Sequence, residues 1–362
     1  MTQPEPILEV RDLQVSFVTD EGIVQAVDGV SFDLRAGEIL AVVGESGCGK
    51  SVTAMTLLGL TRSPNARIAG AATYKGRELL GCSDEQLQRI RGAEIALISQ
   101  ESIGALNPVQ RIGSQIIEQI RAHEVVPKRA ARERAIELLA RAGIPHSRER
   151  VDAYPHEFSG GMRQRVMIAM ALSCAPSIVI VDEPTTALDV TIQAQILDRF
   201  RELRAETGAG LILVTHDLGV VADIADRVAV MYAGRIVEQG SLEDIFYDPQ
   251  HPYTWGLLGA ITRIDRPRRE CLPTIPGLPP SLANRPQGCH LRPRCPHEFD
   301  ECSKVPPLQA RGDAPDHLDR CWLAPERKRR LRELEPGEIG LAHKAPPSKP
   351  TPTPTKPTRD AA

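Results

Sequence analysis

The feature that most constrains this chain is a glycine-rich loop, Gly44-Glu-Ser-Gly-Cys-Gly-Lys50-Ser51, which fits the pattern G-x-x-x-x-G-K-S. It follows an apolar run, Ile39–Val43, that we predict to be a strand, and it precedes a predicted helix at Val52–Leu60. Glycines let the backbone turn its N–H groups around phosphate oxygens, while the helix directs its positive end at the same anion. The sequence therefore predicts a nucleotide site with Lys50 on the β- and γ-phosphates and the Ser51 hydroxyl on Mg²⁺. The loop residues assigned to ATP are Gly44, Ser46, Gly47, Cys48, Gly49, Lys50, Ser51 and Val52.

Other polar residues follow further predicted strands. Asp182 and Glu183 end the run Ile178–Val181, His216 follows Leu211–Val214, and Gln100 ends a run that starts at Ile95. In open α/β sheets the ligand lies beyond the carboxyl ends of the strands. We assign Asp182 to Mg²⁺, Gln100 to Mg²⁺ or the attacking water, Glu183 to a general base or water-positioning group, and His216 to a γ-phosphate contact. Alone, acids after a strand are also common turn residues, and an isolated histidine is more often structural than catalytic.

A third motif, Ser159-Gly160-Gly161-Met162, precedes a predicted helix and forms a capped N-terminus with exposed amides. Together with the loop, Gln100, Asp182-Glu183, Ala187-Leu188-Asp189 and His216 in this order, it makes residues 7–245 closely resemble an ABC-type ATPase. Strands that alternate with helices already indicate a mostly parallel α/β core. The resemblance implies an ABC nucleotide-binding domain with a RecA-like parallel sheet, an N-terminal antiparallel β subdomain and a helical subdomain at about 101–160.

The resemblance also implies roles for individual residues. ATP would lie between the phosphate loop of one subunit and the segment from Ser159 through Gly160 to Gly161 of a partner. Phe17 would stack on adenine, although Val24 is close enough in sequence to leave that contact open. Asp189 would organise the dimer seam, and Glu183, His216 and Gln100 would form the hydrolytic centre. The usual Leu-Ser-Gly-Gly-Gln reads Phe158-Ser-Gly-Gly-Met162 here, which retains the serine and glycines, so we expect activity.

A narrower resemblance joins the chain to the dipeptide/oligopeptide and nickel permease branch. It rests on Tyr154-Pro-His-Glu-Phe158, His251-Pro-Tyr-Thr-Trp255 and the prolines around Gly277. This implies an importer ATPase that powers uptake of di- or oligopeptides. The implied partners are a second, non-identical ABC ATPase, two transmembrane permease subunits that contact the segment from Gln100 to about Glu118, and, indirectly, an extracytoplasmic binding protein. The alternatives are nickel or another small solute as cargo, or a soluble regulatory ATPase without a membrane partner. A module that never hydrolyses conflicts with Glu183 and His216.

Composition limits the other functions. Lys plus Arg is 44 and Asp plus Glu is 47, so the net charge is −3, and aromatic residues make up only 4%. This balance gives no broad attraction to nucleic acid and little material for base stacking. The longest uncharged stretch, Val166–Val181, has 16 residues, contains Pro176, and is shorter than the about 20 that a membrane span needs. Residues 1–9 lack the features of a signal peptide. We expect a peripheral protein on the cytoplasmic face of the cell membrane.

Between residues 289 and 321 the chain carries four cysteines, Cys289, Cys295, Cys302 and Cys321, without a C-x-x-C pair. Spacing alone fits neither a zinc ribbon nor a ferredoxin, and four buried reduced cysteines are an alternative. Because some peptide-permease ATPases carry a 4Fe-4S cluster here, the resemblance implies that cluster first and zinc second, with Cys271, His290 and His297 as alternative ligands. The expected domains are the ATPase at 1–245, the cysteine-containing C-terminal extension at 246–330, and a flexible Pro-rich tail at 331–362.

Overall fold

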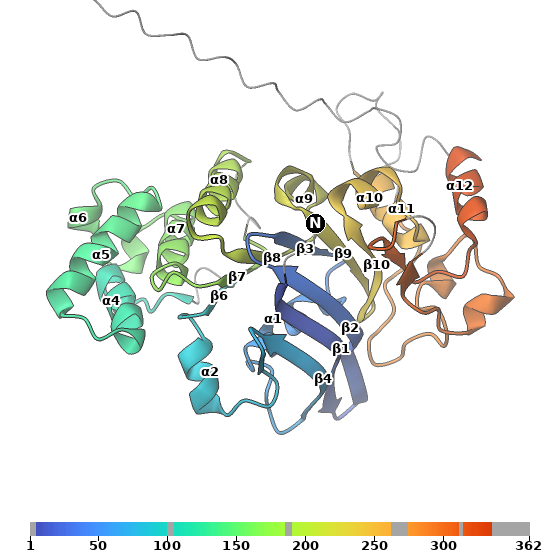
Figure 1. Cartoon of the computed structure of the whole chain (residues 1–362), viewed down its shortest axis with the longest axis horizontal. Helices are drawn as coiled ribbons and strands as arrows, with labels where there is room; N and C mark the ends of the chain where they lie inside the picture. The colour runs from blue at the N-terminus through green and yellow to red at the C-terminus, as the bar shows by residue number, and fades with distance from the viewer. Residues whose placement is uncertain (1–4, 100–104, 185–189, 262–273, 311–313, 335–362) are drawn as a thin grey trace, which may run out of the picture.

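The structure is a computed structural model, and it describes residues 5–99, 105–184, 190–261, 274–310 and 314–334, with the backbone alone for 190–192 and 333–334. The chain forms a mixed sheet and a smaller antiparallel sheet, which lies below it in Figure 1. The predicted tail beyond residue 334 is outside the described residues.

The antiparallel sheet has the order β2-β1-β4-β5. Its strands are β1 (Pro6–Thr19), β2 (Gly22–Arg35), β4 (Ala66–Tyr74) and β5 (Arg77–Glu78). Strands β1 and β2 pair antiparallel, which confirms the N-terminal antiparallel β subdomain that the family resemblance implies. A register shift in β1 between Val10 and Leu13 keeps both of these residues buried, since an extra residue in a bulge moves the alternation by one position.

The larger sheet has the order β11-β12-β10-β9-β3-β8-β7-β6. Its strands are β3 (Ile39–Val43), β6 (Ile95–Ile98), β7 (Ile178–Asp182), β8 (Gly210–Thr215), β9 (Arg227–Tyr232), β10 (Arg235–Ser241), β11 (Gln309–Ala310) and β12 (Leu318–Asp319). Strands β9, β3, β8, β7 and β6 are parallel, and β3, β7 and β8 are buried along their whole length. Burial on both faces explains why these strands are continuous apolar runs.

Helices cover this core. They are α1 (Lys50–Leu57), α2 (Asp84–Ile90), α4 (Ile112–His123), α5 (Lys128–Arg141), α6 (Ser147–Arg150), α7 (Gly160–Ala171), α8 (Val190–Thr207), α9 (Leu218–Ile224), α10 (Leu242–Tyr247), α11 (Pro252–Gly259) and α12 (Pro325–Leu334), with 3-10 turns η1 (Pro155–Glu157), η2 (Arg292–Arg294) and η3 (Asp300–Ser303). The first helix begins and ends earlier than predicted. Gly49 adopts φ 104° before α1 and Gly59 adopts φ 64° after it, and both values lie outside helical geometry.

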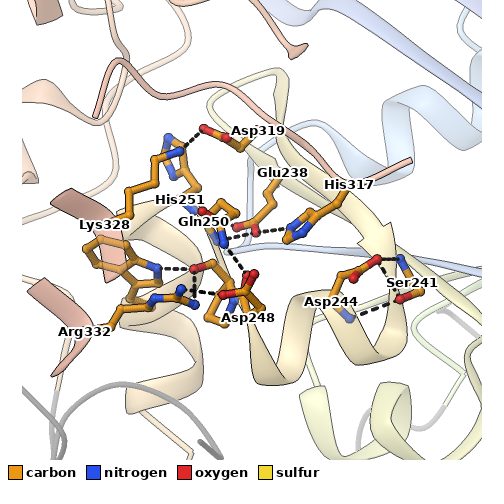
Figure 2. A network of polar contacts seen from close by, with 12 residues as sticks. Glu238, Ser241, Asp244, Asp248, Gln250, His251, His317, Asp319, Lys328 and Arg332 are labelled. Carbon is orange, nitrogen blue, oxygen red and sulfur yellow. Dashed lines mark hydrogen bonds and ion pairs between the residues drawn. The ribbon is translucent and has the colours of Figure 1, made fainter. Parts of the chain in front are cut away.

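The C-terminal extension is attached to the edge of the larger sheet, where β12 pairs with β10. Buried Glu238 of β10 accepts a hydrogen bond from the backbone N–H of His251 at 2.9 Å and meets His317 Nε2 at 2.8 Å (Figure 2). Lys328 of α12 and Asp319 of β12 form a buried ion pair at 2.6 Å in the same network. Among the described residues, no helix is long and apolar enough to cross a membrane.

Candidate functional site

The phosphate loop joins β3 to α1, and two of its glycines are required by close contacts. A Cβ on Gly44 would lie 2.1 Å from the carbonyl oxygen of Met231, and one on Gly49 would lie 2.2 Å from that of Ala26. Both glycines also have positive φ angles, 156° and 104°. The loop can therefore sit against β9 and β2 only if these two positions carry no side chain.

Lys50 lies folded over this loop. Its side chain is buried, and Nζ donates hydrogen bonds to the carbonyl oxygens of Gly44 at 2.7 Å and Glu45 at 3.0 Å. The ammonium group is thus held at the centre of the loop by backbone oxygens. Anionic phosphate oxygens are stronger acceptors than these carbonyls, because a hydrogen bond between charged partners gains more energy than one to a neutral partner.

Ser51 and Asp182 meet as the sequence predicts. The Ser51 hydroxyl of α1 donates to Asp182 Oδ1 at the end of β7, over 3.0 Å. Asp182 is only 3% exposed, and burial raises the pKa of its carboxyl, assisted by Glu183 and opposed by the bond from Ser51 and by the charge of Lys50. A buried carboxylate beside a hydroxyl supplies two hard oxygen donors. These two residues fit Mg²⁺.

Glu183 and His216 lie next to this pair, at the ends of β7 and β8. The Nδ1 atom of His216 is 3.2 Å from Oε1 of Glu183. The side chain of Glu183 is 12% exposed and that of His216 is 54% exposed. The backbone of Glu183 has φ 48°, and its N–H donates to the carbonyl oxygen of Val214 at 2.8 Å. The backbone hydrogen bond to the neighbouring strand thus holds Glu183 in its strained conformation. The contact with His216 orientates the Glu183 carboxylate.

Ser159 and Gly160 lie on a different part of the molecule, at the N-terminus of α7 in the helical subdomain. Ser159 caps the helix, since its Oγ accepts from the Met162 N–H at 3.3 Å. Both residues are exposed, and a Cβ on Gly160 would have no heavy atom within 4 Å. The capped amides therefore face open space on this chain and leave room for an anion on another molecule.

The remaining predicted site residues are only partly described. Phe17 lies near the end of β1, opposite Val24 in the strand register, and packs partly buried against the core of the antiparallel sheet. Gln100 and Asp189, with Cys271 of the extension, lie outside the described residues. Adenine stacking by Phe17 and the roles of Gln100 and Asp189 stay predictions.

The phosphate loop also has contacts with the C-terminal extension that the sequence did not predict. The backbone N–H of Glu45 donates to the Tyr253 hydroxyl at 2.9 Å, and Arg294 binds both oxygens of the Glu45 carboxylate, at 2.8 and 3.0 Å. The Glu45 carboxylate raises the pKa of the Arg294 guanidinium further above its usual range. Tyr253 belongs to a motif that we had used only as a family mark. No spacing rule could link Glu45 with residues 208 and 249 positions away.

The four cysteines do not assemble as predicted. Cys321 packs with Trp255 and Leu323 in a core of its own, and its Sγ accepts from the Leu323 N–H at 3.5 Å. Burial raises the pKa of Cys295 to about 11 and that of Cys321 to about 12, so without a metal both thiols stay protonated at neutral pH.

The alternative ligands have other contacts. His290 Nδ1 lies 3.1 Å from the Ala233 carbonyl oxygen, and the His297 ring packs on Trp255. Within the part of the chain that the structure describes, no three His, Cys, Asp or Glu side chains are grouped to hold a metal ion. As they lie, Cys289, Cys295, Cys302 and Cys321 do not fit a metal centre, and the predicted 4Fe-4S cluster and zinc are unsupported.

Comparisons with known proteins agree with this geometry. The sequence model described as ABC transporter matches residues 27–186, and that described as Oligopeptide/dipeptide transporter, C-terminal region, matches residues 237–302. The chain is 51% identical to the dipeptide transport ATP-binding protein DppD of Bacillus subtilis over 325 residues, 89% of this chain and 96% of that protein. It is 50% identical to the oligopeptide transport ATP-binding protein OppD of Salmonella typhimurium over 322 residues, 88% of this chain and 95% of that protein. The solved dimer of the ATP-binding cassette MJ0796 bound to ADP and phosphate covers 65% of this chain and 98% of that chain, with a TM-score of 0.59 and 25% identity.

Proposed function

This chain belongs to the ABC transporter family, among the dipeptide and oligopeptide transport ATP-binding proteins, and we propose that it hydrolyses Mg-ATP to drive peptide uptake through a membrane complex. The observation that carries the proposal is the meeting of three elements at one sheet edge. Ser51 of α1 contacts Asp182 at the end of β7, and Glu183, which directly follows β7, contacts His216 beyond β8. A nucleotide loop, two oxygen donors for a cation and a base held by an imidazole together suit attack of water on a terminal phosphate.

Each residue has a distinct task in this proposal. Lys50 exchanges its two carbonyl partners for the β- and γ-phosphates, and the loop amides bind the same oxygens. Ser51 and Asp182, together with Gln100, hold Mg²⁺, which when bound neutralises charge on the phosphate oxygens. The Glu183 carboxylate accepts a proton from the attacking water, while His216 fixes its orientation and contacts the γ-phosphate.

The site requires a second subunit. Ser159 and Gly160 present their amides to open space on another subdomain, so one copy leaves the γ-phosphate without them. The dimeric cassette to which this fold is similar supports closure between two subunits. We propose that the partner ATPase is non-identical and supplies its own serine and glycines, that Asp189 lines the seam, and that Phe17 stacks on adenine.

The transporter assignment adds membrane partners. Two permease subunits would contact the segment from Gln100 to Glu118 at the cytoplasmic face of the membrane, and an extracytoplasmic receptor would deliver the cargo. DppD and OppD are named for dipeptide and oligopeptide transport, which favours peptides over nickel. We assign the permease contacts to the helical subdomain at about 101–160.

The decisive experiment uses the assembled complex. The chain is co-expressed with candidate permease and partner ATPase subunits, placed in nanodiscs, and assayed for phosphate release with a receptor loaded with peptides or with Ni²⁺. We expect peptide-loaded receptor to stimulate hydrolysis and Lys50→Ala to abolish it. Lys75→Ala, which removes a bond to Ser177 and a contact with the Tyr74 ring, should preserve it. Failure to co-purify with membrane subunits would favour a soluble regulatory ATPase, and stimulation by Ni²⁺ alone would change the cargo.

A further inference from the structure

The phosphate loop is held from below by the C-terminal extension, at its second residue. The main chain of Glu45 donates to the Tyr253 hydroxyl of α11, and its side chain is bound by both terminal nitrogens of Arg294 in η2. The backbone and the side chain of Glu45 are thus both held by a segment that follows the ATPase core in sequence. The apolar packing of α11 places Tyr253 there, since its ring lies 4.5 Å from that of Tyr232 in β9.

Arg294 is buried in this position, and each of its side-chain N–H groups has a hydrogen-bond acceptor. Its Nε donates to the Pro276 carbonyl at 2.8 Å and Nη2 also lies 3.4 Å from the Ile275 carbonyl, while Nη1 also reaches the Tyr232 hydroxyl at 3.3 Å. The side chain is only 5% exposed. A planar guanidinium that grips a carboxylate with two parallel bonds fixes both position and orientation of its partner.

The charge of Glu45 gives this contact a function. The loop has to accept a triphosphate of several negative charges, and Glu45 lies between Gly44 and the residues whose amides meet it. An unpaired carboxylate there would repel the nucleotide and would compete for Lys50, which already contacts the Glu45 carbonyl at 3.0 Å. Pairing with Arg294 neutralises the carboxylate and draws it toward the extension.

We propose that Arg294 is a positioning residue for ATP binding, which acts through Glu45 and makes the extension part of the nucleotide site. The proposal rests on the proposed ATPase function. Arg294 does not touch the nucleotide. Its removal leaves a half-buried carboxylate without its partner beside the phosphates, and this is expected to weaken Mg-ATP binding about tenfold, since hydrogen bonds to charged groups are worth roughly that factor or more.

The test is a double-mutant cycle on the full chain. Arg294→Met, Glu45→Gln and the double variant are titrated with Mg-ATP by calorimetry, and steady-state kcat and KM for ATP are measured in the assembled complex. We expect Arg294→Met to raise Kd and KM about tenfold with a smaller change in kcat. The double variant should recover most of the affinity, because the neutral amide no longer repels phosphate. The thermal stability of the double variant should stay as low as that of Arg294→Met, since the Pro276 and Ile275 carbonyls still lack their donor.

The controls separate this proposal from simpler explanations. Arg332→Met removes a comparable arginine of the extension, bonded to the Pro249 carbonyl at 3.0 Å, and should leave ATP affinity unchanged. Arg294→Gln keeps a donor for one carbonyl oxygen, and we expect it to weaken ATP binding about tenfold, as Arg294→Met does. It therefore serves as the test variant if Arg294→Met does not fold. Affinity within twofold of the parent in both Arg294 variants, or no recovery on adding Glu45→Gln, would overturn the inference. Loss of binding in Lys50→Ala, measured alongside, tests the ATP site independently; if the parent itself binds no Mg-ATP, the proposed function fails first.

Discussion

Glu183→Gln should separate ATP binding from hydrolysis. The substitution is isosteric, keeps the backbone bond from residue 183 to the Val214 carbonyl, and leaves an amide oxygen within reach of His216 Nδ1 at 3.2 Å. The φ of 48° is equally strained for both residues, so the free energy of unfolding should change by less than about 0.5 kcal/mol. What is lost is the proton acceptor. A general base typically contributes a factor of about 10² to 10⁴, so the barrier to hydrolysis should rise by about 3–5 kcal/mol.

The assay is single-turnover hydrolysis of radiolabelled ATP with enzyme in excess, together with Mg-ATP titration. We expect binding within about twofold of the parent and a rate reduced about a thousandfold. Because hydrolysis no longer dismantles the ATP-bound state, gel filtration with Mg-ATP should show subunits that stay associated. Glu206→Gln, which affects only a surface pair with Arg141, serves as the control. A rate within tenfold of the parent would remove Glu183 from its assigned role.

Three further results are expected. ATPase turnover per subunit should rise with protein concentration, since each nucleotide needs amides from a partner; a constant value would contradict the shared site. Lys328→Met should lower the stability of the extension by about 3–5 kcal/mol in urea, read by the fluorescence of its two tryptophans, because Asp319 stays buried without its cation, and adding Asp319→Asn should restore part of it. Acidification from pH 7 to 5 should also destabilise the extension through His251 and His290, and the raised pKa of His317 offsets only part of this loss. Burial lowers the pKa of His251 to about 3, so the unfolded chain binds the extra proton below its usual pKa of 6.5, at a cost of about 2 kcal/mol by pH 5. His251→Asn, which retains an acceptor for the Tyr253 N–H, should reduce the loss of stability between pH 7 and 5. An unchanged loss in this variant would exclude His251 as its cause.

Much of the core could be predicted because its signals are local. The apolar runs at β3, β7 and β8 become strands buried on both faces, and the residues that follow them meet at one edge because parallel strands end together. Ser51 and Asp182, 131 positions apart, form a bond that the sequence reading anticipated, since each lies at a defined place on a strand or a helix.

The cysteines show the opposite case. A short stretch of sequence that holds four thiols predicts neither where each side chain points nor which core it joins. Cys321 follows β12 into contact with Trp255, while the backbone N–H of Cys289 bonds to Cys302 at 2.9 Å. These cysteines lie in one segment of the fold, yet among the described residues no three metal-binding side chains are grouped to hold an ion.

From its sequence alone, this chain specified a phosphate-binding loop, the acids and histidine beyond three strands, and a capped helix with glycine amides, because each of these depends on backbone geometry that a few consecutive residues dictate. Tertiary structure alone decided that Arg294 and Tyr253 would reach Glu45. That contact depends on how β9, α11 and η2 pack, and packing joins residues by shape and burial rather than by spacing along the chain.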